Sequence, residues 1–405
     1  MAAPLLVRNR NYRLLFAAGA LANLGDGLIV LALPWLATLM TRDPVAIAAV
    51  AAATRLPWLL FAVPAGVVID RTDRRKLIAR ADMLRAGIVM AIMILALSEP
   101  TPAMVWALVA LAFLLGSAEV LRDNAAQTIL PAIVAPGDLE AANGQMWSAE
   151  QLTGQFIGPP LAGLLIGVGA AVPFGADAAM LVLAAGLVWL ITLPPQLRIV
   201  SPFWQALMEG VSWMRRDAPL LRLAVLLGLV NFLYMTATTM IVLFSQDVLG
   251  LSAAEYGMLL SIGAIGAVAG SLGSPVVVDR IGIQASLFVS LAVWGLAYIA
   301  IGLTSSPVVV AVAMFSLMAA SMLWNVITVS WRQRRIPPEL LGRVNSIYRF
   351  FGWGSMPLGA FAGGIVVSLM EDEAGRDAAL RAPFLLAAAG SGVLLFYAIL
   401  RLRLR

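Results

Sequence analysis

The sequence predicts an all-α polytopic membrane protein with 12 transmembrane helices in two pseudo-symmetric six-helix bundles. Of its 405 residues, 61% are hydrophobic and 12% are charged, about half the charged fraction of a typical soluble domain. Apolar runs of about 20 residues, long enough to cross a bilayer, recur from one end of the chain to the other. Charged and turn residues of the first half also return in the second half, which predicts two related bundles.

The first half contains six apolar spans. We expect them at about 14–40, 45–69, 77–97, 103–133, 139–168 and 172–193. Three arginines precede the first span, and Arg71, Arg74, Arg75 and Lys76 lie between the second and the third. Because basic loops resist translocation, both segments are predicted to be cytoplasmic.

A long polar interval at 194–219 separates the halves, and its apolar residues are spaced as on one face of a helix. We interpret it as a cytoplasmic linker with an amphipathic surface helix. Six further spans are expected at about 220–248, 253–278, 284–304, 308–332, 341–370 and 381–402. This predicts an N-terminal bundle at 1–193, the linker at 194–219 and a C-terminal bundle at 220–405. Both termini would be cytoplasmic, in a multi-pass protein of the cell inner (cytoplasmic) membrane.

Two sequence repeats relate the halves. Val-Val-Ile-Asp-Arg at 67–71 returns as Val-Val-Val-Asp-Arg at 276–280, 209 residues later. The pattern Pro-x-x-Leu-x-x-x-Asn, which begins at Pro136, returns at Pro338. Chance similarity between apolar helices does not easily produce matched charged and proline positions. Two parallel copies place a transport site at their interface.

The loop between the second and third spans resembles a motif of the major facilitator superfamily, Gly-x-x-x-Asp-Arg-x-Gly-Arg-Arg/Lys. Asp73 stands where the family pattern has glycine. The resemblance implies that Asp70 caps the eleventh helix beside Arg343 and closes the cytoplasmic side, and that a weaker latch lies in the second half. The residues of this conformational gate are Gly66, Asp70, Arg71, Arg74, Arg75, Asp279, Arg280 and Arg343.

The fifth span resembles the signature of drug:proton antiporters of that superfamily. Its small residues predict a closely approaching helix, and Pro159 predicts a kink. The antiporter motif comprises Gly154, Gly158, Pro159 and Gly163, with Ala162 in place of one glycine. Symporters of the superfamily generally lack this motif, so the resemblance favours export. Segments 334–345 and 352–357 resemble the group of macrolide-efflux proteins and enterobactin exporters.

Charged residues within the spans are functional candidates because charge inside a bilayer is costly. The proton-coupling candidates are Asp26, Glu119, Glu150, Arg55 and Arg122. Depth along the helices suggests the pairs Asp26–Arg55 and Arg122–Glu150. An arginine that leaves its carboxylate raises the proton affinity of that carboxylate, which would couple protonation to transport. Static pairs that hold helices together are the alternative, and the choice among the three carboxylates stays open.

The function that we predict is proton-coupled efflux, by antiport and alternating access, of a small hydrophobic or amphipathic drug. Candidates for lining a substrate cavity between the halves, chosen by depth and polarity, are Asn23, Asn231, Tyr234, Trp324 and Asn325. The expected partners are protons, membrane lipid and the substrate, with no nucleic acid, and the expected state is a monomer. The proton gradient would supply energy without a cofactor, and a chain without His or Cys lacks the usual ligands of zinc or haem.

Three alternatives remain at this point. A dedicated exporter of a siderophore or lipid-like metabolite would use the same fold. A solute:proton importer fits the fifth-span motif less well, and a non-transporting receptor would bind ligand without flux. An enzyme is not expected, because no long loop carries a nucleophile–base arrangement.

Overall fold

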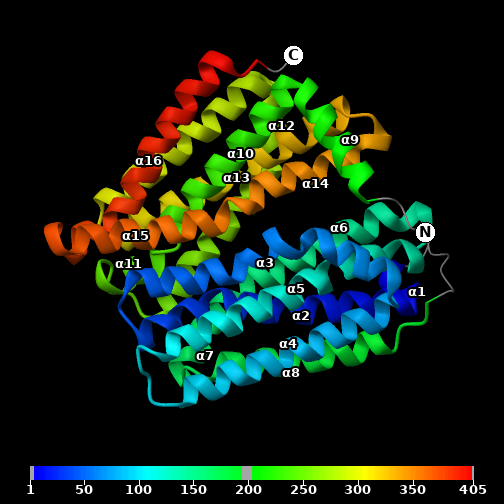
Figure 1. The fold of residues 1–405 in the computed structure, drawn as a ribbon, viewed down its shortest axis with the longest axis horizontal. Helices are drawn as coiled ribbons and strands as arrows, with labels where there is room; N and C mark the ends of the chain where they lie inside the picture. Colours follow the sequence, from blue (N-terminus) through cyan, green and yellow to red (C-terminus); the bar gives the residue numbers. More distant parts are fainter. Residues whose placement is uncertain (1–3, 194–202, 404–405) are drawn as a thin grey trace. The chain divides into compact units, whose positions relative to one another are not determined.

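The computed structural model describes residues 4–193 and 203–403, and all the regular structure in these two ranges is helical (Figure 1). The side chains within helices at 62–64, 66–71, 203–207, 209–210, 338–339, 341–343, 345–346 and 349 lie outside this description. In the first half the helices are α1 (Leu5–Arg8), α2 (Arg10–Met40), α3 (Pro44–Arg71), α4 (Arg74–Leu97), α5 (Met104–Ile133), the 3-10 turn η1 (Pro136–Asp138), α6 (Leu139–Glu150), the π-helix η2 (Gln151–Ile157), α7 (Gly158–Val168) and α8 (Val172–Trp189). In the second half they are α9 (Phe203–Arg216), α10 (Ala218–Thr238), α11 (Ile241–Asp247), α12 (Ala253–Leu303), α13 (Pro307–Arg335), α14 (Pro338–Gly354), α15 (Met356–Ala374) and α16 (Arg376–Arg401).

The chain forms two compact units. The first comprises Met1–Arg42, Ala53–Val200 and Ser252–Ser261. In it α8 packs against both α2 and α4, and α4 packs against α5, so these helices lie side by side (Figure 1). The α2 residues that face inward include Ala18 and Ala22, whose small side chains let neighbouring helices approach. This four-helix layer holds the charged side chains described below.

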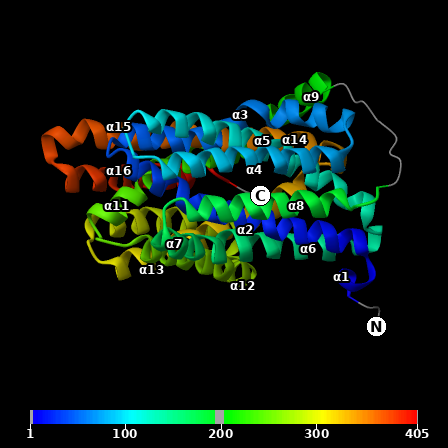
Figure 2. The same cartoon turned by 90° about the horizontal axis from the view of Figure 1, so that it is seen from below.

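The second unit comprises Asp43–Ala52, Ser201–Leu251 and Ile262–Arg405. Here α10 packs against α15, α16 and α14. Helices α12 and α13 lie side by side (Figure 2), and glycines of α12 face the α13 backbone. A Cβ added at Gly266 would lie 2.8 Å from Phe315 Cα, and one at Gly270 would lie 2.6 Å from Ala319 Cα. Glycine is required at both positions because the backbones of the two helices nearly touch.

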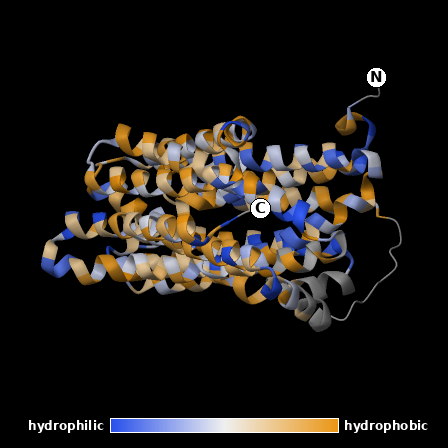
Figure 3. Cartoon of the chain, turned by 90° about the horizontal axis from the view of Figure 1, so that it is seen from above, coloured by the Kyte–Doolittle hydropathy of each residue, from blue (hydrophilic) through white to orange (hydrophobic). Residues whose placement is uncertain are grey.

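Nine helices of the described residues are long and apolar enough to cross a membrane. In Figure 3 much of the helical ribbon is orange, the colour of hydrophobic residues. Many large apolar side chains also face outward, such as Val168 at 79% and Leu272 at 76% exposure. Outward-facing apolar surface on this scale suits a lipid environment, so the chain is an integral membrane protein.

Several of the expected spans are interrupted. The span predicted at 139–168 is divided into α6, η2 and α7, and the π-helical turn ends where Pro159 and Pro160 follow. Proline has no N–H and clashes with the carbonyl four residues earlier, so regular α-helical bonding cannot continue through this point. The spans predicted at 253–278 and 284–304 are joined in α12 across a kink at Gly282, whose φ is 80°. The span at 341–370 is divided between α14 and α15.

The departure of Asp73 from the family pattern has a local explanation. Asp73 has a φ of −64°, so its backbone needs no glycine, and its side chain accepts a hydrogen bond of 3.2 Å from the Lys76 N–H. This is an N-cap of α4, a position that aspartate favours. Asp73 therefore begins the helix that carries two central charges of the site.

Candidate functional site: a buried ion-pair network in the first unit

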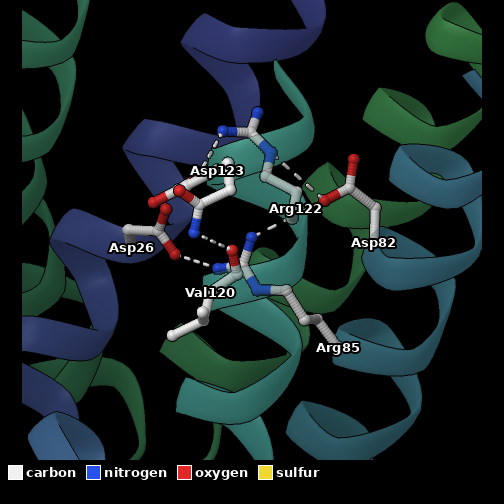
Figure 4. Close-up of polar contacts among 7 residues, drawn as sticks. Asp26, Asp82, Arg85, Val120, Arg122 and Asp123 are labelled. Atoms are coloured by element: carbon white, nitrogen blue, oxygen red, sulfur yellow. Dashed lines mark hydrogen bonds and ion pairs between the residues drawn. The ribbon is translucent and has the colours of Figure 1, made fainter. Parts of the chain in front are cut away.

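The network centres on an ion pair between α2 and α4. The Arg85 guanidinium, 1% exposed, donates through Nη2 to Asp26 Oδ1, while the Asp26 side chain keeps 29% of its surface exposed (Figure 4). Asp26 lies in the middle of the long α2, and Gly25 and Gly27 on either side leave room for neighbouring helices. The Arg85 side chain is thus buried in the protein, while the Asp26 side chain is partly exposed.

A second arginine joins α4 to α5. Arg122 Nε lies 3.5 Å from Asp82 Oδ1, and its Nη1 donates to Asp123 Oδ1 at 3.0 Å (Figure 4). Asp82 is fully buried and also lies 3.6 Å from Arg85 Nη1. Asp82 therefore lies between the two arginines and links both pairs into one network.

The charged groups of the network lie close together, but several of their polar atoms form no hydrogen bond within the described part of the chain. Both oxygens of Asp82, Nε and Nη1 of Arg85, and Nε of Arg122 are buried without a hydrogen-bond partner among the described residues. Buried polar groups without partners cost free energy, typically about 1–3 kcal/mol each.

Three further predicted residues lie around this network. Glu119 on α5 is half-buried, and the charged groups near it are Asp26, Asp123, Arg85 and Arg55. Arg55 on α3 is half-buried and forms no ion pair within the described parts of the chain. Glu150, at the end of α6, is exposed.

The partners of Asp26 and Arg122 differ from those suggested by depth. Asp26 pairs with Arg85, not Arg55, and Arg122 pairs with Asp82 and Asp123, not Glu150. Depth along the first, second, fourth and fifth spans suggested the predicted pairs, whereas Arg85 and Asp82 lie on the third span. The signal was present in the sequence, because Asp82 and Arg85 are charged residues inside an apolar span and are three positions apart, on one helix face.

The fifth-span motif lies against the same helix as Asp26. A Cβ added at Gly158 would lie 2.7 Å from the carbonyl carbon of Gly27, and one at Gly154 would lie 3.1 Å from the Asn23 carbonyl oxygen. The close helix approach predicted from the glycines is therefore confirmed, and it occurs one turn from Asp26.

The other side of the motif contacts the start of α12. A Cβ at Gly163 would lie 2.7 Å from Ala254 Cα, and one at Gly257 would lie 2.9 Å from Pro160 Cα. Ser261 donates a 2.9 Å hydrogen bond to the Phe156 carbonyl. Pro160 lacks the N–H that would bond this carbonyl in an α-helix, so Ser261 compensates for the proline.

Some of the predicted gate residues can be placed. Arg74 donates to the Thr128 carbonyl at 2.8 Å, and Arg75 donates to the Ile191 carbonyl at 3.0 Å and lies over the Trp189 ring. Both arginines thus bind backbone carbonyls of the first unit. Asp279 and Arg280 are exposed on α12. The other gate positions, Gly66, Asp70, Arg71 and Arg343, lie outside the described side chains.

The predicted cavity residues occupy different environments. Asn23 is half-buried beside Gly154, and Asn231 donates a 2.8 Å hydrogen bond to the Gly352 carbonyl. Tyr234 is half-buried and Asn325 is exposed. Trp324 is 2% exposed and packs against Trp294, with ring centroids 5.5 Å apart. No group of three or more His, Cys, Asp or Glu residues arranged to hold a metal ion occurs in 4–193 and 203–403 where side chains are described.

Comparison with known proteins identifies relatives across the whole chain. Residues 2–403 match the model of the family described as transmembrane secretion effector, a group of the major facilitator superfamily. The chain is 25% identical over 321 residues to macrolide efflux protein A of Enterococcus faecalis, covering 75% of this chain and 95% of that protein. It is 28% identical over 395 residues to the multidrug efflux pump Tap of Mycolicibacterium fortuitum, covering 92% of each.

Solved structures show the same fold. A mutant of the nucleoside transporter NupG is similar with a TM-score of 0.78 and 16% identity, over 98% of this chain and all of that one. A bacterial homologue of the iron transporter ferroportin in an inward-facing state is similar with a TM-score of 0.73 and 18% identity, over 96% and 98%. These are membrane transporters and not enzymes. The chain therefore belongs to the transmembrane secretion effector family of major facilitator superfamily transporters.

Proposed function

We propose that the protein exports small hydrophobic or amphipathic compounds of the drug type in exchange for protons, by alternating access. We further propose twelve membrane spans in two bundles, 1–193 and 220–405, joined by the linker 194–219. In this arrangement the protein is a monomer in the cytoplasmic membrane with both termini in the cytoplasm.

The relatives favour drugs as the substrates. Macrolide efflux protein A and the multidrug efflux pump Tap carry these activities in their names, and both align over most of the chain. None of the relatives described above is named for siderophore export. Among the predicted substrate residues we retain Asn23, Asn231, Tyr234, Trp324 and Asn325 as proposals.

The observation that carries the coupling proposal is the Asp26–Arg85 pair. A proton must reach its acceptor, and Asp26 is partly exposed while its cationic partner is sealed inside the unit. An adjacent guanidinium favours the ionised form of a carboxylate, and protonation of Asp26 cancels the attraction that holds Arg85. Proton binding at Asp26 would therefore release Arg85 and break the ion pair that joins α2 to α4.

The other two carboxylates rank behind Asp26. Glu119 is half-buried and within the field of Arg85 and Arg55, so it is the second proton-coupling candidate. Glu150 is exposed at the end of α6, away from a direct arginine contact in the described structure. Protonation of Glu150 would release no ion pair, which makes it the weakest of the three.

The test is proton-gradient-driven export of a lipophilic cationic dye from proteoliposomes that contain the purified protein. We expect wild-type flux to follow the pH gradient and Asp26→Asn to lose at least tenfold of the gradient-driven component. The matched control is Asp138→Asn, which removes the same charge from the exposed Arg8–Asp138 pair and should retain wild-type flux.

Each result has a distinct meaning. Gradient-driven flux that persists in Asp26→Asn would transfer the role to Glu119. Wild-type flux that does not depend on the pH gradient would overturn the proposal of proton coupling. Absence of flux with several chemically unrelated dyes would overturn broad drug export.

A further inference from the structure

One more carboxyl group, that of Asp177, lies beside the Asp26–Arg85 pair. Asp177 lies on α8 and is 0% exposed. Both of its carboxyl oxygens are buried and have no hydrogen-bond partner among the described residues. A buried carboxyl group without such a partner is rare and calls for a physical explanation.

Asp177 faces the two helices that hold the Asp26–Arg85 pair. Helix α8 packs against α2 and α4, and a Cβ added at Gly25 would lie 2.9 Å from Asp177 Cγ. Gly25 is adjacent to Asp26 in the chain, so the absent side chain at Gly25 is what admits the carboxyl group of Asp177 beside α2. A bulkier residue at position 25 would separate Asp177 from the network.

The charged groups around Asp177 come from three helices. They are Asp26 on α2, Asp82 and Arg85 on α4, and Glu119 on α5. Arg85 is the one cation in this set. Arg85 and Asp177 do not form an ion pair in this structure, because Arg85 is held by Asp26.

The unused hydrogen-bonding groups of Arg85 and Asp177 are complementary. Arg85 uses Nη2 for Asp26, while its Nε and Nη1 are buried without hydrogen-bond acceptors. Asp177 offers two buried acceptors without donors. A guanidinium and a carboxylate can form two parallel hydrogen bonds, so movement of Arg85 toward Asp177 would satisfy groups that are now unsatisfied on both sides.

We propose that Asp177 is an alternative counter-ion of Arg85, in addition to Asp82, and that the guanidinium alternates between Asp26 and Asp177 during transport. This inference rests on the proposed proton coupling. In the first state of this proposed cycle Asp26 is ionised and paired with Arg85, and Asp177 carries a proton. When Asp26 binds a proton from the solution, Arg85 moves to Asp177, and Asp177 then releases its own proton to the solution. Uptake at Asp26 and release from Asp177 are separate steps of one proton each, so charge and protons balance and the uptake step depends on pH.

The role of Asp177 is therefore positioning: it receives Arg85 and so makes protonation of Asp26 easier. Asp177→Asn has nearly the same shape and keeps a neutral group in the buried site, but it cannot become an anion. Without an anion at position 177 to receive it, Arg85 stays with the Asp26 carboxylate, which then needs a more acidic solution to bind its proton. We expect the pH midpoint of gradient-driven dye export to move to lower pH by about one unit, a tenfold change in the required proton concentration.

The experiment compares pH profiles of dye export for wild type, Asp177→Asn and the control Asp138→Asn. Infrared difference spectra at high and low pH accompany the flux, because a protonated buried carboxyl group gives a C=O stretching band. That band should change on titration of wild type and should lose a component in Asp177→Asn. Equilibrium dye binding checks that Asp177→Asn is folded.

The results separate the two proposals. A wild-type pH profile together with an unchanged infrared spectrum in a folded, dye-binding Asp177→Asn would overturn the role of Asp177 and leave proton coupling intact. Wild-type export without any dependence on the proton gradient would overturn the proposed coupling itself. If Asp177→Asn fails to bind dye, Gly25→Ala tests the same idea from α2 by displacing the Asp177 carboxyl group, and an unchanged pH profile in that variant would also overturn the role.

Discussion

Arg85 connects carboxylates that lie on different helices, and its position explains why several acidic residues can share one buried region. Its guanidinium pairs with Asp26 on α2 and lies 3.6 Å from Asp82 on its own helix. Removing one partner of a buried pair is costly, because the other charge is then left without compensation, and measured losses are about 3–5 kcal/mol.

We therefore expect Arg85→Gln to lower the free energy of unfolding by about 3–5 kcal/mol and to abolish gradient-driven export. Arg80→Gln is the matched control on the same helix, because Arg80 is exposed, and its effect should stay within about 0.5 kcal/mol. Denaturation of the purified protein in detergent measures both. Combining Arg85→Gln with Asp26→Asn should recover part of the lost stability, since the unpaired anion is removed; a purely additive double variant would contradict the pairing.

Sequence reasoning at this scale found Asp26, Glu119 and Arg122 but missed Asp82, Arg85 and Asp177. Charge within an apolar span identifies a residue as a candidate, and that rule applied equally to the third and sixth spans. Which charges pair depends on which helices are neighbours, and depth alone does not give neighbours. The selection of Arg55 as the partner of Asp26 failed because α4, and not α3, presents an arginine to that face of α2.

Among the helices of the first unit, close contacts depend on glycines that lie directly against the backbone of a neighbouring helix. Gly158 faces Gly27 on α2, while Gly163 on the same helix faces the start of α12. Helix α7 therefore contacts backbone atoms on two sides, and no flexible side chain at either contact could move to make room for an added Cβ. The sequence predicted this close approach, but the π-helical turn before α7 and the partner helix were not predictable from glycine spacing.

Gly158→Ala should destabilise the protein by about 1–3 kcal/mol, because the added Cβ would meet backbone atoms 2.7 Å away that cannot rotate aside. Gly167→Ala is the control in the same helix, since nothing lies within 4 Å of its added Cβ, and it should be neutral or stabilising by up to about 1 kcal/mol. Thermal unfolding in a fixed detergent would compare the two. Equal effects would show that helix propensity, not close contact, governs these positions.

At the scale of the whole molecule, the apolar spans and the basic loops predicted a polytopic helical membrane protein, and the fold and family agree. Interruptions of the expected spans at the Pro159–Pro160 pair and at Gly282 could not be placed from hydropathy, because both sides of each break are apolar. The two compact units are also not divided only at the linker. Asp43–Ala52 belongs to the second unit, and Ser252–Ser261 belongs to the first.

The proposed orientation can be tested directly because the chain has no cysteine. Glu99→Cys lies after α4 on the predicted outer side, and Arg334→Cys lies near the end of α13 on the predicted inner side; both side chains are exposed. In intact cells a membrane-impermeant maleimide should label Glu99→Cys and leave Arg334→Cys unlabelled until the cells are opened. The cysteine-free parent gives the background, and the reverse pattern would invert the topology.

Helix α4 also has a consequence for biogenesis. It is not among the nine helices that are apolar enough to cross a membrane by themselves, since Arg80, Asp82 and Arg85 lie within it. A lone charged residue at mid-membrane costs roughly 2.5–3.5 kcal/mol on insertion scales. The neutralising groups of Arg85 and Asp82 reside partly on α2, which is synthesised earlier, and partly on α5, which is synthesised later. In nascent chains that end after α4, this helix would therefore insert into the bilayer only weakly. Its stable insertion would require the later synthesis of α5, which carries Arg122.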